Sequence, residues 1–390
     1  MKLKPLAIAT LVALGAHSAP SMAMSIEERM SQMEQRMQYL EKRVVSQDKA
    51  LAEKDQQIAE LKQSGGSGGG WFQKVEVSGA VEIEASRSSP YTGSSTSDVV
   101  VATAAIGVAA QVNDWTSAEI SLLYEEDDTP LEVDTATITI ADPDAAWFVT
   151  SGQQFVPFGS FETGLVSDPL TLEIGETRET AVLGGFDNGM FSAGVYAFNG
   201  TNEKTSGNET VDNWGAVFGF TRDGFSAGIG YINDIGDSDG LQDGLTGNTL
   251  VDHVPGITAN AMAEFGGFTF IAEYTAATDD FQVGELSFNG AGAQPEAFNI
   301  EIGTGFTLAG KEASFAIAYQ GTDEAIALEL PETRIAAAVS VEIYENTALS
   351  LEWAHDEDYS TSDSGTGING AITGTGKKAD TVTAQLAVEF

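Results

Sequence analysis

The sequence predicts an all-β transmembrane barrel of about 16 antiparallel strands, preceded by a signal peptide and an α-helical coiled coil. Three observations predict this fold. The N-terminus has the parts of an export signal, a heptad pattern follows it, and residues 71–390 alternate apolar with polar or very small side chains. The chain has no cysteine, which excludes disulfides and thiolate metal sites.

Residues 1–23 have the features of a secretory signal peptide. Lys2 and Lys4 supply the positive start, and residues 6–16 (LAIATLVALGA) form an apolar stretch too short to span a bilayer. Small residues at Ser21 and Ala23 flank Met22, as at a signal-peptidase site, so Met24 is the expected mature N-terminus.

Residues 24–63 are predicted to form a periplasmic coiled coil. The apolar seam follows a heptad spacing along Ile26, Met30, Met33, Met37, Leu40, Val44, Gln47, Leu51, Lys54, Ile58 and Leu61. One helix cannot bury this seam, so a partner helix is expected, and analogy favours a homotrimer. Docking on the same chain is the alternative. Residues 64–70 (SGGSGGG) form a flexible Gly/Ser linker.

Residues 71–390 are predicted to be an outer-membrane β-barrel of the porin type. Runs such as 75–85, 268–274, 298–306 and 347–353 place apolar residues at every second position, with Gly, Ser, Ala and Glu between them. Aromatic residues gather near strand ends, as in the girdles of outer-membrane barrels. The alternating run that ends the chain at Phe390 is predicted to be the assembly signal. A secreted β-solenoid or sandwich is the alternative, although the polar face of a soluble sandwich would be rich in Lys, Thr and Glu.

A barrel of this size is predicted to be an open pore. Sixteen strands leave an aqueous channel, and residues 71–390 are too few for 22 strands with a plug domain. The expected location is the outer membrane, with lipid and lipopolysaccharide as partners.

Residues 151–177 form the longest stretch without clear alternation and are predicted to fold into the lumen. Pro157, Pro169 and several glycines interrupt strand pairing there. The constriction candidates in and just after this stretch are Pro157, Glu162, Asp168, Glu173, Glu176, Arg178 and Glu179. A solvated connection outside the barrel is the alternative.

Acidic residues dominate the predicted barrel. The chain has 58 acids and 18 bases, a formal net charge of −40, and this excludes a nucleic-acid binder. Seven acids fall on the polar face of predicted strands and are expected to face the lumen: Glu76, Glu82, Glu84, Glu273, Glu301, Glu342 and Glu352. Such acids favour cations, although simple wetting of the lumen is an equal alternative.

The remaining polar residues predict no enzyme. His253 and His355 are isolated from any convincing nucleophile, and neither a Walker loop nor an HExxH motif is present. The loop acids at 125–128, 234–243 and 356–358 match no EF-hand spacing, and whether they bind calcium stays open. We expect no catalytic residues, no cofactor and no metal site.

Several segments resemble the LbtU-type siderophore porin family. These are WFQKVEVSG at residues 71–79, VPFG at 156–159, FET at 161–163, SDPLTLE at 167–173 and GETRE at 175–179, following the coiled coil and linker. The resemblance implies an outer-membrane barrel for plug-independent uptake of an iron–siderophore complex or a similar small solute. A general cation-preferring porin and an envelope-tethering barrel with a functional coiled coil are the alternatives.

Overall fold

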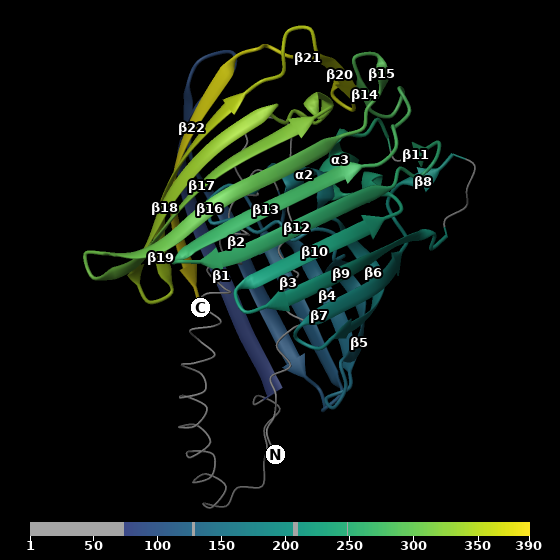
Figure 1. The fold of residues 1–390 in the computed structure, drawn as a ribbon, viewed down its shortest axis with the longest axis vertical. Coiled ribbons are helices and arrows are strands. Elements are labelled where there is room, and N and C mark those ends of the chain that lie inside the picture. The colour runs from purple at the N-terminus through teal and green to yellow at the C-terminus, as the bar shows by residue number, and fades with distance from the viewer. Residues whose placement is uncertain (1–73, 127–128, 206–209, 248) are drawn as a thin grey trace, which may run out of the picture.

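The computed structural model describes residues 74–390, except 127–128, 206–209 and 248, and shows a closed antiparallel barrel (Figure 1). The predicted signal peptide, coiled coil and linker lie outside the described residues. Sixteen strands form the ring in chain order, which confirms the predicted fold class. They are β1 (Val75–Ser89), β2 (Thr96–Gln111), β3 (Thr116–Tyr124), β4 (Glu132–Ala141), β5 (Trp147–Phe155), β6 (Arg178–Asp187), β7 (Phe191–Phe198), β9 (Asn213–Arg222), β10 (Phe225–Ile232), β12 (Gly256–Phe265), β13 (Phe268–Ala277), β16 (Glu296–Leu308), β17 (Lys311–Asp323), β18 (Thr333–Tyr344), β19 (Thr347–Glu357) and β22 (Lys378–Glu389).

The ring closes where the last strand pairs with the first. β22 runs antiparallel to β1, and the backbones of Gly79 and Phe390 exchange hydrogen bonds of 2.9 and 3.0 Å. The ring of Phe390 lies directly over Gly79, where an added Cβ would stand 2.6 Å from the phenyl Cζ. A side chain at position 79 therefore cannot coexist with this position of the terminal phenylalanine.

The two faces of the barrel wall differ as the alternation predicts. On β1, Val81 and Ile83 are exposed on the outer face, whereas Glu82 and Glu84 are buried on the inner face. The same contrast separates exposed Phe270 from buried Ile271 on β13. Because neighbouring side chains of a strand point to opposite faces, the outer surface is apolar and the inner one largely polar.

The connections at the two rims differ strongly in length. Between consecutive barrel strands, one rim has only short turns, at 112–115, 142–146, 188–190, 223–224, 266–267, 309–310 and 345–346. The other, the long-loop rim, has connections at 90–95, 125–131, 156–177, 199–212, 233–255, 278–295, 324–332 and 358–377. Short turns on one side and long loops on the other are typical of outer-membrane barrels.

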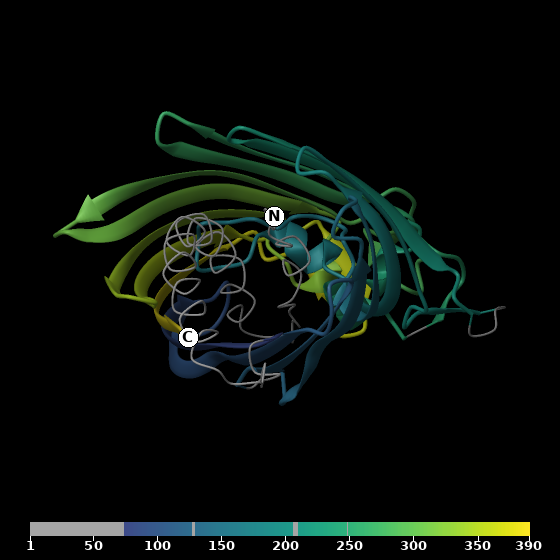
Figure 2. The same ribbon diagram turned by 90° about the horizontal axis from the view of Figure 1, so that it is seen from below.

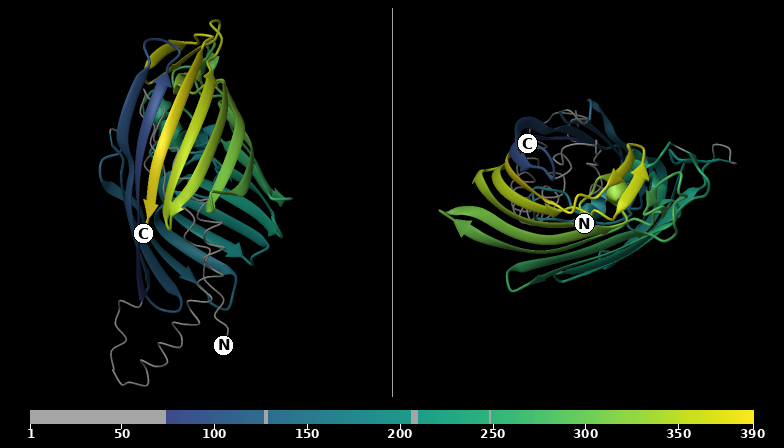
Figure 3. Two further views of the ribbon diagram at one scale, coloured as in Figure 1. Left: turned by 90° about the vertical axis from the view of Figure 1, so that its left-hand side faces the viewer. Right: turned by 90° about the horizontal axis from the view of Figure 1, so that it is seen from above.

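Small elements occur in the long loops, and most gather at that rim (Figure 3). They are the parallel pair β8 (Glu203–Lys204) and β11 (Thr249–Leu250), the four-stranded sheet of β14 (Ser287–Phe288), β15 (Ala291–Gly292), β20 (Ser364–Gly367) and β21 (Gly370–Thr373), the helices α2 (Leu170–Gly175) and α3 (Asp239–Gly244), and the 3₁₀ turns η2 (Ile235–Asp237) and η3 (Ile326–Leu328). Within the described part of the chain, no helix is both long and apolar enough to cross a membrane.

The long loops share an apolar core with the inner wall. Phe158, Leu241 and Phe281, from three different loops, are buried together with Phe198 and Ile232, the last residues of β7 and β10. Burying side chains of this size supplies about 1.5–3 kcal/mol each. These loops therefore form one packed body at the mouth of the barrel.

Candidate functional site

The connection between β5 and β6, residues 156–177, is called the inward loop here because it lies against the inner face of the barrel wall. The segment begins later than the predicted stretch, since residues 151–155 belong to β5. Its helix α2 packs on β13, β16 and β17, inside the ring of strands (Figure 2). Gly159, at φ 96°, turns the chain just before the first anchored residues. The sequence did not predict this helix.

Three inward carboxylates anchor successive parts of the inward loop. Glu273 on β13 accepts the backbone N–H groups of Ser160 and Phe161, both at 2.7 Å. The Thr171 hydroxyl donates to the same carboxylate at 3.2 Å. Backbone N–H groups bonded to a charged acceptor contribute more than neutral pairs, about 1.5–3 kcal/mol each.

The next two anchors continue along the wall. Glu301 on β16 accepts the N–H of Gly164 and the Thr163 hydroxyl, both at 2.6 Å. Glu352 on β19 accepts the N–H groups of Val166 and Ser167 at 2.5 and 3.0 Å. The loop therefore crosses from β5 to the wall formed by β13–β19.

An amide and a floor of alanines complete the attachment. The N–H of Leu170 donates to Gln320 Oε1 on β17 at 3.1 Å. Leu165 is fully buried against small inward residues of β17 and β18, namely Ala316, Ala318, Ala336 and Ala338. Because alanine leaves room above the sheet, the loop backbone comes close enough for the carboxylates to reach it.

The far end of the inward loop is fixed by ion pairs. The guanidinium of Arg178, the first residue of β6, lies 2.7 Å from Glu132 and 3.3 Å from Asp134 of β4. Its backbone N–H donates to Asp239 in α3, and the N–H of Asp239 donates to the Glu176 carbonyl. The inward loop and the loop holding α3 are thus joined.

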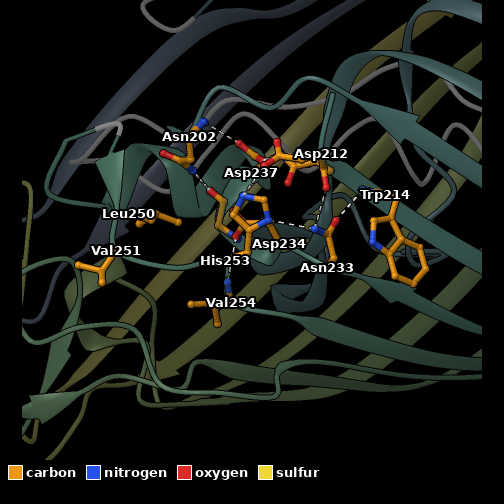
Figure 4. Close-up of polar contacts among 12 residues, drawn as sticks. Asn202, Asp212, Trp214, Asn233, Asp234, Asp237, Leu250, Val251, His253 and Val254 are labelled. Atoms are coloured by element: carbon orange, nitrogen blue, oxygen red, sulfur yellow. Dashed lines mark hydrogen bonds and ion pairs between the residues drawn. The ribbon is translucent and has the colours of Figure 1, made fainter. Parts of the chain in front are cut away.

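A buried polar cluster holds the 233–255 loop at the long-loop rim (Figure 4). Asp237 accepts hydrogen bonds from the Asn202 backbone at 2.8 Å and the Asn213 side chain at 2.6 Å. Asp234 accepts from the N–H groups of Gly236 and Val254. Burial, together with the neighbouring Asp237, raises the pKa of Asp234 to about 8, and burial raises that of Asp237 to about 6.

The hydrogen bonds of His253 in this cluster indicate its tautomer. Asn233 accepts the Trp214 N–H through Oδ1, so its amide nitrogen faces His253 Nδ1 at 2.9 Å. Nδ1 is then the acceptor, and Nε2 carries the proton toward Asp212 and Asp234, at 3.8 and 3.9 Å. No group of three metal-ligating side chains occurs among the described residues.

The structure brings some of the predicted loop candidates together and separates others. Glu162 is buried in the inward loop, while Pro157, Glu173 and Glu176 are half-buried there. Asp168 is buried just before α2. Glu179 lies on β6 and accepts a hydrogen bond from the Thr201 hydroxyl.

The predicted lumen-facing acids divide into two groups. Glu273, Glu301 and Glu352 accept hydrogen bonds from the inward loop. Glu82 and Glu84 are buried on the inner face of β1, Glu76 is exposed near the start of that strand, and Glu342 is half-buried near the end of β18. The lumen acids predicted as one set therefore occupy different surroundings.

Several residues of the site escaped the sequence analysis. Gln320 holds the inward loop, Arg334 pairs with Asp356, and Asn299 is fully buried between Glu273 and Gln320 in the strand register. Gln320, Asn299 and Arg334 alternate along their strands with apolar, outward-facing residues. This alternation was the signal that could have identified them as inward-facing. Asp239 was among the loop acids at 234–243 in the sequence analysis, but its contacts with Arg178 and Glu176 of the inward-loop region were not expected.

The closed barrel, its unequal rims and its inward loop define a porin-type fold. Solved structures similar to the chain include an anion-selective porin from Comamonas acidovorans, with a TM-score of 0.57 at 14% identity, covering 81% of this chain and 99% of that one. OprB of Pseudomonas putida has a TM-score of 0.54 at 10% identity, over 82% and 95%. The channel DcaP of Acinetobacter baumannii has a TM-score of 0.52 at 12% identity, over 81% and 97%. At such identities the likeness is one of fold.

The chain belongs to the UPF0422 family. It is 30% identical to the UPF0422 protein of Coxiella burnetii, over 81% of this chain and 72% of that protein. It is also 30% identical to a UPF0422 protein of Legionella pneumophila strain Philadelphia 1, over 354 residues and 81% of this chain. The chain spans 66% of the length of that Legionella relative. No protein-family model matches the chain.

Proposed function

We propose that the protein is a passive outer-membrane channel whose lumen is narrowed by the inward loop and prefers cations. The observation that carries the proposal is the loop itself, hydrogen-bonded to carboxylates inside a closed barrel with an apolar outer face. A barrel of 16 strands is wide enough to hold water, and a loop fixed inside it sets the size of what passes.

The charges of the inner wall support the cation preference. Among the described residues, the two inward arginines are already paired, Arg178 with Glu132 and Asp134, and Arg334 with Asp356 at 2.8 and 3.0 Å. Glu273, Glu301 and Glu352 are engaged by the inward loop. The acids on the inner face of the wall, Glu82, Glu84, Glu273, Glu301, Glu342 and Glu352, outnumber these arginines, and this surplus supports a negative potential in the lumen.

Ion selectivity tests this proposal. Purified protein in planar bilayers should show reversal potentials on the cation side in a KCl gradient, and the preference should weaken as salt screens the lumen. Replacing Glu82 and Glu84 by Gln should reduce the preference, whereas Glu345→Gln, in a short turn, should leave it unchanged. Reversal on the anion side would contradict the proposal.

We further propose that the solute is an iron–siderophore complex. The support is the family resemblance, whose segments from 156 to 179 coincide with the inward loop and the start of β6. A negative lumen favours a neutral or cationic chelate over an anionic one. A strain lacking the protein should grow poorly on such a ferric chelate and normally on ferrous iron. Equal growth of mutant and parent on every iron source would leave a general cation-preferring porin.

An envelope tether is the remaining candidate, with the barrel as an anchor in lipid and lipopolysaccharide and the predicted coiled coil as the working part. Its support is the long apolar seam in residues 26–62. A conductance trace separates the two: a tether needs no current, and a channel must carry one.

A further inference from the structure

Glu162 occupies a position between the first two anchors of the inward loop. Phe161, before it, donates its N–H to Glu273, and Thr163, after it, donates its hydroxyl to Glu301. The Glu162 side chain is only 7% exposed, and its Oε2 has no hydrogen-bond partner in the described part of the chain. Seating the loop on the wall therefore buries a third carboxyl beside two others.

The groups facing Glu162 increase the difficulty of ionising it. They are Glu273 on β13 and Glu301 on β16, both carboxyls already used as acceptors. Glu352 on β19 interacts in turn with Glu301, and Arg334 near Glu352 is ion-paired with Asp356. Burial and these two carboxyls raise the pKa of Glu162 to about 8.

We propose that Glu162 makes the inward loop a proton-dependent strap, which is seated on the wall while Glu162 is neutral and released when Glu162 ionises. The physical reason is that an ionised Glu162 would be a third buried charge of one sign without an ion-pair partner in that patch. Such a charge is expelled to water, and it takes the adjoining loop residues with it. The effect of release on ion current rests on the proposed channel function, but the release itself does not.

The direction with pH follows from the raised pKa. An acid with a raised pKa favours the state that keeps it protonated, so the advantage of the seated loop is full below the ordinary carboxyl pKa of about 4.3 and is lost as the pH rises to about 8. About one tenth of Glu162 is ionised at pH 7 and about nine tenths at pH 9. Release is therefore expected on the alkaline side of neutrality.

A cysteine reporter tests the strap without relying on conductance. The chain has no native cysteine, and Val166 is buried in the loop next to the Glu352 anchor. In detergent-solubilised Val166→Cys protein, the maleimide labelling rate is divided by that of exposed Thr361→Cys, which removes the thiol's own pH dependence. We expect this ratio to rise about tenfold between pH 7 and pH 9, following the ionised fraction.

Adding Glu162→Gln should keep the ratio constant over the same range, because the amide is never charged. Glu285→Gln, a buried carboxyl in another loop, is the matched control and should leave the rise intact. Heat-modifiable migration at each pH verifies that every variant is folded. A labelling ratio that still rises with pH in the Val166→Cys, Glu162→Gln double variant would overturn the proposal. A ratio that does not rise in Val166→Cys alone would also overturn it.

Bilayer recordings then separate the strap from the channel. An increase in conductance above pH 8 that Glu162→Gln abolishes supports both. Labelling that rises while conductance stays at zero leaves the strap standing and contradicts the channel. Conductance that rises while labelling stays constant overturns the strap.

Discussion

At the scale of single residues, the same side chain performs different tasks on neighbouring strands. Glu301 and Glu352 each accept hydrogen bonds from two donors of the inward loop. Glu342, on β18, lies instead at the short-turn end of the wall. Carboxylates aimed at backbone N–H groups bind the loop, and their charge is partly neutralised by doing so.

Removing an anchor should loosen the inward loop. Glu301→Ala leaves the N–H of Gly164 and the Thr163 hydroxyl without their acceptor, a loss of about 1–3 kcal/mol per buried donor. We expect higher single-channel conductance and more current noise. Glu345→Ala, an exposed residue in a short turn, is the control and should keep the parental conductance; equal behaviour of the two variants would contradict the anchoring role.

The buried Asp234 should make the long-loop rim less stable as the pH rises. Its pKa in the folded protein is about 8, against about 3.9 when unfolded, so folded protein is favoured below about pH 4 and loses this advantage up to about pH 8. Asp234→Asn keeps an acceptor oxygen for Gly236 and Val254 and removes the charge. The variant should show a higher temperature of heat modification at pH 8 than the parent.

The comparison needs an exposed acid as its control. Asp279→Asn, in another long loop, should leave the heat-modification temperature unchanged. A pH profile of Asp234→Asn that follows the parent's at every pH would show that the burial of this carboxyl has no energetic consequence.

At the scale of elements, the inward loop depends on a wall with small side chains. Leu165 packs onto inward alanines of β17 and β18, and Leu170 and Ile174 of α2 pack with Ala297 of β16. A larger residue on this floor lifts the loop away from its carboxylate acceptors.

Overpacking the floor should therefore mimic the loss of an anchor. Ala338→Leu places extra volume under Leu165 and should cost about 1–3 kcal/mol. Raised conductance with a fully folded barrel is the expected result. Ala337→Leu, the next residue on the outer face, adds the same volume toward lipid, and an equal effect from both variants would exclude steric lifting of the loop.

At the scale of the whole molecule, the barrel depends on the contact between its two ends. Phe390→Asp should impair outer-membrane assembly, because the last strand must pair with β1 and the aromatic ring lies over Gly79. The amount of heat-modifiable protein in outer-membrane fractions measures this. Phe390→Tyr keeps the ring and should assemble normally; normal assembly of Phe390→Asp would refute the predicted signal.

The predicted coiled coil should set the oligomer. Deleting residues 26–62 removes the seam that one helix cannot bury alone, so the cross-linked mass should fall while the barrel stays folded. The parent is expected to cross-link as a trimer. An unchanged oligomer after the deletion would place the contacts in the barrel instead.

The sequence by itself determined the barrel. Alternation of apolar and polar residues determines which side chains face lipid. A shift of the strand register by one residue would turn the polar side chains toward the hydrocarbon, so the register is strongly specified. The strand number was predicted from the count of alternating runs together with the even strand numbers of bacterial barrels. The break in alternation, predicted at residues 151–177, also located the loop, although its first five residues belong to β5.

Only the tertiary structure decided what the inner carboxylates do. Glu82 and Glu301 look alike in sequence, since both are acids at inward-facing positions of alternating strands. Glu82 lies on β1, away from the anchors of the inward loop, whereas Glu301 accepts a hydrogen bond from Gly164, 137 positions earlier in the chain. The pairing of Arg178 with β4 and the burial of Glu162 between two anchors depend likewise on which strands the loop crosses. Local periodicity records which face a residue occupies, whereas the partner across the lumen is set by the closed register of sixteen strands.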